Sequence, residues 1–235
     1  MLRSNLKITK FSIAAFLLVE LVLGILIQVG INEGSNYLRF ASVVIAFIFS
    51  LLLANRSIDS MLVGVALLFT VCADYCLVIM SPAPKILAMV FFNVVQLLYF
   101  ARILLSESDR RMRLVNVSLR SLVIVAAVII TVIVLGDRTD ALSIISIVYF
   151  ADLAVNIIFA FVEHKRFLLF AIGLVCFACC DIFVGLSVLV TDYISTSQES
   201  LLYTLTHTKI DMVWLFYVPS QTLIAISNLK RNTVK

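Results

Sequence analysis

Eight long apolar runs are the feature of this sequence that most limits what the chain can fold into. Each run approaches the roughly 20 mostly apolar residues that an α-helix needs to cross the hydrocarbon core of a bilayer. The second run is the shortest of them. The runs cover residues 11–31, 38–54, 61–80, 86–105, 114–136, 141–162, 167–190 and 212–229.

The composition excludes an ordinary soluble domain. Of the 235 residues, 63% are hydrophobic and 14% are charged, whereas soluble domains average roughly 45–50% apolar and 25% charged residues. Several runs are rich in Val and Ile, but lipid favours helices because an open sheet edge leaves backbone groups without partners. We therefore predict an all-α, multi-pass membrane protein in which residues 1–235 form a single transmembrane domain of about eight helices.

The basic residues are distributed unevenly between alternate connections. If the N-terminus lies inside, the outer segments hold only Arg39, Lys85, Arg138 and Lys209, and the other 14 of the 18 basic residues are inside. The positive-inside rule then predicts that both termini are cytoplasmic. The basic segment 110–120 is interpreted as an inner loop rather than a nucleic-acid patch. We expect a bacterial cytoplasmic (plasma) membrane location and no nucleic-acid partner.

Single polar residues recur at matching places in the two halves of the chain. The third and seventh runs each carry one acid, Asp74 and Asp181, and the fourth and eighth runs each carry one glutamine, Gln96 and Gln221. Matching helices are four apart in the chain, so the two halves would have the same orientation. This pattern predicts a parallel 4+4 repeat, and binding sites in such proteins form between the repeats.

Acids inside the apolar runs are the candidate functional residues. A charged carboxylate at the bilayer centre costs roughly 2.5 to 3.5 kcal/mol to insert, so such residues usually face the bundle interior and mark function. The candidates are Asp74, Asp181, Asp152 and Glu20. The alternative interpretation is that they form structural hydrogen bonds between helices.

Helical periodicity adds other polar side chains to these acids. Tyr149, Asp152 and Asn156 share one face of the sixth run, and Trp214, Tyr217 and Gln221 share one face of the eighth. We expect the polar faces to meet in one pocket, although each Asn, Gln or Tyr taken singly also fits packing between helices. The predicted substrate-binding residues are Thr70, Asn93, Gln96, Tyr99, Asp152, Asn156, Tyr217 and Gln221. Arg102, at the cytoplasmic end of its helix, is interpreted as a snorkelling anchor.

The predicted chemistry follows from two carboxyl groups in one water-poor pocket. Burial and a neighbouring negative charge both favour the neutral form, so one group would hold a proton while the other accepts one. An acid and a base suit hydrolysis through an oxocarbenium-like intermediate. The sequence has no nucleophile elbow, HExxH motif, P-loop or Rossmann fingerprint.

The five cysteines and two histidines do not indicate a disulfide framework or a metal site. All the cysteines lie inside apolar runs, where a free thiol behaves as a small hydrophobic group. His164 and His207 lie in predicted loops on opposite sides of the membrane. We expect neither a metal nor a cofactor.

Four stretches of the sequence form an ordered set of motifs: residues 67–77 (LLFTVCADYCL), 96–99 (QLLY), 180–186 (CDIFVGL) and 214–221 (WLFYVPSQ). Together they resemble the lysoplasmalogenase (YhhN-type) family of integral membrane proteins. The resemblance implies an eight-helix fold, a lysophospholipid substrate, and contact with the surrounding membrane lipids. It also implies hydrolysis of the vinyl ether bond of lysoplasmalogens, with Asp74 and Asp181 as catalytic residues. Gln96 and Cys180 depart from the family pattern, which has His and Ser there.

Two other function classes remain open. In a small proton-coupled transporter, or a lipid-binding membrane protein without hydrolase activity, the aspartates would relay protons rather than catalyse hydrolysis. A transporter of this kind has Gly or Pro breaks at corresponding positions of both halves. Only Pro219 interrupts an apolar run here, which favours the hydrolase.

Overall fold

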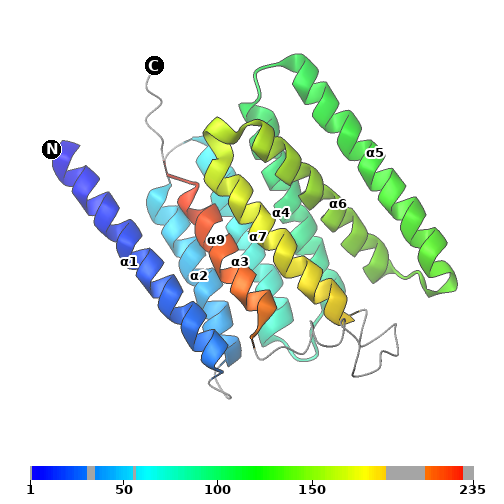
Figure 1. The fold of residues 1–235 in the computed structure, drawn as a ribbon, viewed down its shortest axis with the longest axis horizontal. Helices are drawn as coiled ribbons and strands as arrows, with labels where there is room; N and C mark the ends of the chain where they lie inside the picture. The colour runs from blue at the N-terminus through cyan, green and yellow to red at the C-terminus, as the bar shows by residue number, and fades with distance from the viewer. Residues whose placement is uncertain (1, 31–34, 55–56, 189–209, 230–235) are drawn as a thin grey trace.

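The computed structural model describes residues 2–30, 35–54, 57–188 and 210–229, and in these ranges the chain is helical and contains no strand (Figure 1). The all-α prediction is therefore confirmed. The helices are α1 (Leu2–Val29), α2 (Ser35–Leu53), α3 (Ile58–Asp74), η1 (Tyr75–Ile79), α4 (Lys85–Ser106), α5 (Arg110–Leu135), η2 (Gly136–Arg138), α6 (Ala141–Val162), α7 (His164–Val188) and α9 (Met212–Ile226).

The helices have the length and composition of membrane spans. Seven of those described are long and apolar enough to cross a bilayer, and α9 is an apolar helix of 15 residues. The second predicted run is a full helix of 19 residues. The eighth predicted run gives the shorter helix, because Asp211 caps α9 and the chain leaves the helix at Ser227.

The basic segment between the fourth and fifth runs is helical rather than a loop. The Asp109 side chain accepts a hydrogen bond from the Arg111 backbone N–H, so α5 begins at Arg110. The predicted inner loop at 110–120 is therefore wrong, because this cap starts the helix four residues before the apolar run begins.

Helix α6 begins with a capping box outside the apolar span. The Ser143 backbone N–H donates to Asp140 Oδ1 over 2.7 Å, and the Ser143 side chain accepts from the Asp140 backbone N–H. These hydrogen bonds lower the pKa of the exposed Asp140 carboxyl, and the bond from the Ser143 backbone has the largest effect. The cap fixes the start of α6 at Ala141, where the sequence predicted it.

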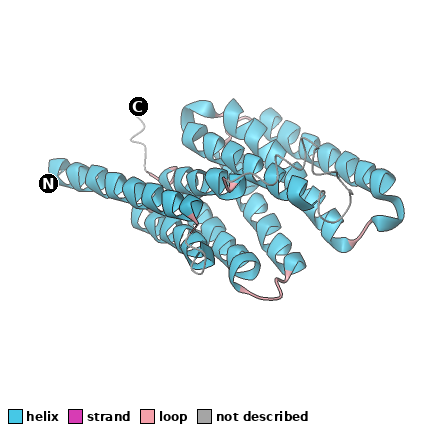
Figure 2. Cartoon of the chain, turned by 60° about the horizontal axis from the view of Figure 1, so that its bottom comes forward, coloured by secondary structure: helices cyan, strands magenta, loops and turns pink. Residues whose placement is uncertain are grey.

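The bundle has an inner group of helices and two flanking ones. Helices α3, α4, α7 and α9 lie centrally, whereas α1 and α5 lie at opposite edges (Figure 1). Helix α1 packs on α2 and α9, and α5 packs on α6. Turned to a second view, the described chain is a set of helices joined by short connections (Figure 2).

Three of the helix–helix contacts recur between matching helices of the two halves. Helix α3 packs on α4 as α7 packs on α9, α2 packs on α3 as α6 packs on α7, and α4 packs on α6 as α9 packs on α2. This is the arrangement that a parallel 4+4 repeat predicts. The start of α1 and the end of α9 also lie at the same end of the bundle (Figure 1), as an even number of spans requires.

Candidate functional site

The first aspartate lies where α3 changes its winding. Asp74 is the last residue of α3, and the π-helix η1 follows it directly. π-Helical turns are rare and frequently mark functional sites. The Asp74 side chain is 4% exposed, and its Oδ2 accepts a hydrogen bond of 2.6 Å from the Tyr217 hydroxyl. Tyr217 belongs to α9, so this pair joins the two halves of the chain.

The second aspartate has an equivalent partner. Asp181, in α7, accepts a hydrogen bond of 2.6 Å at Oδ2 from the Tyr149 hydroxyl, which comes from α6. Tyr149 is buried, and Asp181 is partly buried. Each aspartate therefore has one carboxylate oxygen fixed by a tyrosine from another helix.

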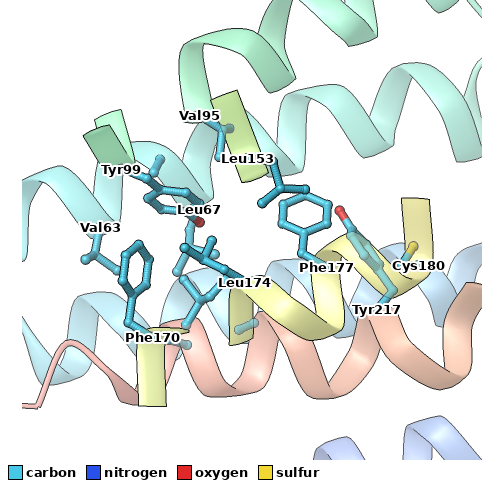
Figure 3. Packing of buried hydrophobic residues seen from close by; sticks show 14 of the residues in the cluster. Val63, Leu67, Val95, Tyr99, Leu153, Phe170, Leu174, Phe177, Cys180 and Tyr217 are labelled. Carbon is cyan, nitrogen blue, oxygen red and sulfur yellow. The ribbon is translucent and has the colours of Figure 1, made fainter. Parts of the chain in front are cut away.

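Phe177 links the two aspartate–tyrosine pairs. Its ring centroid lies 5.5 Å from that of Tyr217 and 6.2 Å from that of Tyr149. Figure 3 shows the rings of Phe177 and Tyr217 beside each other. Asp181 is close enough to Asp74 for their charges to interact. We call Asp74, Asp181, Tyr149 and Tyr217 the acid cluster.

Three of the predicted binding residues carry buried polar atoms without a hydrogen-bond partner among the described residues. They are Gln96 at Nε2, Tyr99 at the hydroxyl and Gln221 at both amide atoms. All three side chains are at most 1% exposed. Buried polar groups are normally paired, so these atoms are available to a bound molecule.

Two other predicted binding residues make structural contacts. The Thr70 hydroxyl donates to the backbone carbonyl of Ala66, one turn earlier in α3, over 3.1 Å. Asn93 donates to the carbonyls of Met89 and Ile145, at 2.8 and 3.2 Å. The amide of Asn93 therefore joins α4 to α6, which is the packing alternative that the sequence left open.

Asp152 and Asn156 are held by an arginine that the sequence placed in a loop. Arg120 of α5 is buried and ion-paired with Asp152, and its Nη2 donates to Asn156 Oδ1 over 2.7 Å. The amide of Asn156 in turn donates to the backbone carbonyl and Oε1 of Gln96, both at 3.0 Å. The expectation that all polar faces meet in one pocket is therefore wrong for Asp152, because this acid is ion-paired with Arg120 of α5.

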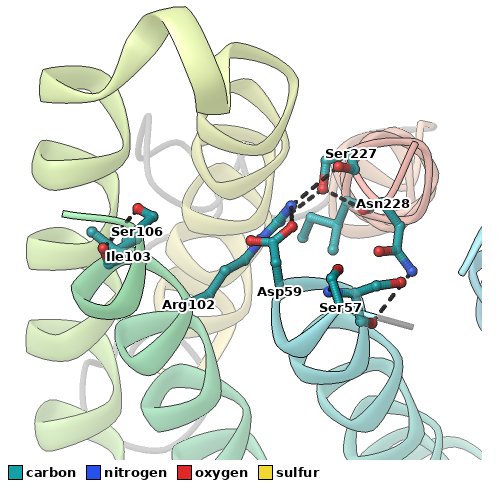
Figure 4. Close-up of polar contacts among 9 residues, drawn as sticks. Ser57, Asp59, Arg102, Ile103, Ser106, Ser227 and Asn228 are labelled. Atoms are coloured by element: carbon teal, nitrogen blue, oxygen red, sulfur yellow. Dashed lines mark hydrogen bonds and ion pairs between the residues drawn. The ribbon is translucent and has the colours of Figure 1, made fainter. Parts of the chain in front are cut away.

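The cytoplasmic end of the bundle, as predicted from charge, holds a second buried arginine. Arg102 donates to Asp59 Oδ1 over 3.0 Å and to the Ser227 hydroxyl over 2.9 Å (Figure 4). Its guanidinium carbon lies 4.5 Å from the ring centroid of Phe170. The interpretation of Arg102 as a snorkelling anchor is wrong, because Asp59 and Ser227 provide partners inside the bundle and the side chain is 2% exposed.

Glu20 lies apart from the acid cluster. It accepts a hydrogen bond of 2.6 Å at Oε2 from the Ser42 hydroxyl, between α1 and α2. All five cysteines are free thiols. Within the described ranges, no group of three or more His, Cys, Asp and Glu side chains could hold a metal ion.

The sequence placed Tyr149 on a polar face but not among the predicted site residues, and it missed Phe177. Tyr149 shares a helical stripe with Asp152, but its hydroxyl reaches α7 whereas Asp152 reaches α5. Phe177 is one Phe among 17, and only its position one turn before Asp181 distinguishes it. The useful signal is therefore the aromatic residues one turn away from an intramembrane acid.

Comparison with known proteins gives one match. A sequence model described as the YhhN family matches residues 35–228, which include both aspartates and both tyrosines of the acid cluster. No curated protein and no solved structure matches the chain.

Proposed function

This chain belongs to the YhhN family, and from that premise we propose that it is a membrane hydrolase of lysoplasmalogens. The proposed reaction cleaves the vinyl ether bond of a 1-alkenyl lysophospholipid with water. The products are a fatty aldehyde and a glycerophospho-alcohol. No metal or cofactor takes part in the proposed mechanism.

The observation that carries this proposal is the pairing of the acid cluster across the two halves of the chain. Two carboxyl groups, each oriented by a tyrosine hydroxyl, lie within charge-interaction range in the bundle interior. A vinyl ether hydrolyses in two acid–base steps, and each step needs one proton donor or acceptor. Two fixed carboxyl groups supply both roles.

The first step is proton transfer to carbon. One carboxylic acid of the cluster donates its proton to the vinyl carbon farther from the ether oxygen. The double bond supplies the electron pair for the new C–H bond, and an oxocarbenium ion forms at the other carbon. The resulting carboxylate and the aromatic faces of Tyr149, Phe177 and Tyr217 stabilise this cation.

The second step is addition of water. The other aspartate, acting as a base, removes a proton from the water whose oxygen bonds to the oxocarbenium carbon, giving a hemiacetal. Collapse of the hemiacetal breaks the carbon–oxygen bond to glycerol. The glycerol oxygen takes the proton that the second aspartate accepted from water, and the hemiacetal hydroxyl gives its proton to the first aspartate. The aldehyde leaves, and both carboxyl groups return to their starting protonation states. The buried polar atoms of Gln96, Tyr99 and Gln221 would position the ether and the water.

Removal of either carboxyl group tests the proposal. We expect purified protein to release fatty aldehyde from a 1-alkenyl lysophospholipid, measured by mass spectrometry. Asp74→Asn and Asp181→Asn should each lower this rate by at least about 100-fold, because acid–base catalysis contributes roughly 10²- to 10⁴-fold. The control is Asp137→Asn, the same change on the exposed turn η2, which should keep the wild-type rate.

The same assay separates the hydrolase from the alternatives. A transporter or a lipid-binding protein would release no aldehyde at any head group. If wild-type protein that is folded, as judged by its thermal unfolding, gives no aldehyde from choline or ethanolamine lysoplasmalogens, the proposed function is wrong.

A further inference from the structure

An arginine outside the acid cluster is connected to it through two aromatic rings. The guanidinium carbon of Arg39, near the start of α2, lies 5.6 Å from the ring centroid of Trp214. The Trp214 ring lies 5.1 Å from that of Tyr217, whose hydroxyl binds Asp74. Trp214 precedes Tyr217 by one turn of α9, so Arg39 lies closer to the helix ends than the acid cluster does.

The surroundings of Arg39 form a fixed, partly exposed charge pair. Arg39 Nη2 is ion-paired with Asp211 Oδ2, and the two side chains are 26% and 27% exposed. Asp211 is itself held in place, because its Oδ1 caps α9 at the Trp214 backbone N–H over 3.2 Å. Gln28 adds two hydrogen bonds to the Asp211 backbone, at 2.9 and 2.8 Å.

Arg39 keeps donors for another ligand. Its Nη2 donates to Asp211 Oδ2, and its Nη1 donates to Asn36 Oδ1 over 3.1 Å. Its Nε is buried and has no partner among the described residues. Since a guanidinium carries five N–H groups in a planar fork, Nε–H and further N–H groups remain available beside the Trp214 face.

We propose that Arg39 binds the phosphate of the lysophospholipid and thereby sets the substrate's position in the site. This inference rests on the proposed function. Arginine is the preferred residue for phosphate because its fork matches two phosphate oxygens. In the substrate, the glycerol backbone lies between the phosphate and the vinyl ether. In the protein, the rings of Trp214 and Tyr217 lie between Arg39 and Asp74. A phosphate at Arg39 therefore matches a vinyl ether at Asp74.

The arrangement also fits the way a lysolipid lies in a membrane. The head group stays at the water boundary, where tryptophan is enriched, and the ether lies deeper. Arg39 and Asp211 are partly exposed, whereas Asp74 is 4% exposed. A lipid with its phosphate at Arg39 therefore directs its ether bond toward the acid cluster.

Trp214 provides a direct measurement, because it is the only tryptophan in the chain. Full-length protein in detergent is titrated with a 1-alkyl lysophospholipid, whose saturated ether is not a vinyl ether, while Trp214 emission is recorded. The parallel titration uses 1-alkylglycerol, which lacks the phosphate. For wild-type protein we expect a saturable change with both ligands and tighter binding of the phospholipid.

Substitution of Arg39 should remove only the phosphate preference. Arg39→Gln should weaken phospholipid binding by about 10- to 100-fold, the range expected for hydrogen bonds to a charged group, and leave 1-alkylglycerol binding unchanged. Arg39→Lys keeps the charge and should keep part of the preference. The control is Arg138→Gln on the exposed turn η2, which should bind both ligands as wild type does.

Three results would overturn this assignment. They are no saturable change in wild-type emission, equal affinity of wild type and Arg39→Gln for the phospholipid, or equal weakening of both ligands in Arg39→Gln. The last result would mean that Arg39 acts through the structure of α9 alone. Because the alkyl lipid reports binding without hydrolysis, failure of the phosphate site at Arg39 is recognised separately from failure of the proposed reaction, which the absence of aldehyde release would show.

Discussion

Each aspartate of the acid cluster is oriented by a hydroxyl that belongs to another helix. The Tyr217 hydroxyl of α9 donates to Asp74, and the Tyr149 hydroxyl of α6 donates to Asp181. In an apolar interior such hydrogen bonds are stronger than in water, so they hold the carboxyl group in one rotamer. In the proposed reaction, the second oxygen of each carboxyl group is the one that gives or takes the proton.

Removal of a tyrosine hydroxyl should slow catalysis without unfolding the protein. A hydrogen bond to a charged group contributes about 1.5 to 3 kcal/mol, so Tyr217→Phe should lower the rate of aldehyde release by about 10- to 100-fold. The phenyl ring keeps the contacts with Trp214 and Phe177. The measurement is aldehyde release together with thermal unfolding in detergent.

A neighbouring tyrosine provides the control for that experiment. Tyr75 follows Asp74 in the chain, is 48% exposed, and contacts Phe40 through its ring at 5.8 Å. Tyr75→Phe should retain the wild-type rate. If Tyr217→Phe were as active as Tyr75→Phe, the hydroxyl at Asp74 would have no role in the reaction.

The sequence could identify the two catalytic candidates but not the partners of every acid. Asp74 and Asp181 stand out because they are lone acids at matching places in the two halves of the chain. Asp152 looked equivalent, yet Arg120 neutralises it from a helix that begins earlier than the apolar pattern indicates. Periodicity gives the face of a helix on which a residue lies, but it does not say which neighbouring helix that face meets.

The position of α5 depends on a small number of polar contacts. The helix packs on α6 and lies at the edge of the bundle. Arg120 joins it to Asp152 and Asn156 of α6, and its guanidinium carbon lies 4.1 Å from the ring centroid of Phe100 in α4. In lipid there is no hydrophobic driving force between helices, so this polar contact specifies where α5 binds.

Loss of one partner of this ion pair should destabilise the fold and spare the chemistry. The two side chains are 7% and 4% exposed, and an unpaired buried charge costs about 3 to 5 kcal/mol. We therefore expect Arg120→Met to lower the unfolding temperature strongly. The double variant Arg120→Met, Asp152→Leu should recover much of the loss. Activity per folded molecule should stay near wild type, and a selective loss of turnover would instead place Asp152 in the site.

A glycine sets the distance between α7 and α9, the helices that carry Asp181 and Tyr217. A Cβ added at Gly173 would lie 2.9 Å from Ile224 Cγ1 and 3.2 Å from the Ser220 carbonyl oxygen. Overpacking of this kind costs about 1 to 3 kcal/mol, so Gly173→Ala should lower the unfolding temperature. In Gly185→Ala on the same helix, the added Cβ meets nothing within 4 Å. We expect that control to be as stable as wild type, and equal behaviour of the two variants would contradict the close approach.

Helix ends were less predictable than helix existence. The apolar runs located every described long helix, because spanning length is fixed by the bilayer. The start of α5 at Arg110 and the π-helix at Tyr75–Ile79 depend on individual capping groups and on local winding. Neither feature has an apolar periodicity of its own, so the sequence pattern did not reveal them.

At the scale of the whole molecule, the acid cluster depends on how the two halves meet. Asp74 and Tyr217 come from different halves, whereas Asp181 and Tyr149 come from the same half. The matching neighbours of the two halves agree with the repeat that the lone acids and glutamines predict. The aspartate–tyrosine pairs do not follow this symmetry, because the tyrosines stand on non-equivalent helices.

The basic residues and the positions of the helix ends predict how the bundle is oriented in the membrane. The start of α1 and the end of α9 lie at one end of the bundle, and 14 of the 18 basic residues fall on the predicted cytoplasmic side. Green fluorescent protein fused after Lys235 should therefore fluoresce, because it folds in the bacterial cytoplasm and not after export through the general secretion route. Alkaline phosphatase, which is active only after export, should be active when inserted after Arg138 in the turn between α5 and α6. The reverse pattern would place Arg39 and the ion pair with Asp211 at the cytoplasmic face, so the lipid head group would approach the acid cluster from the inner leaflet.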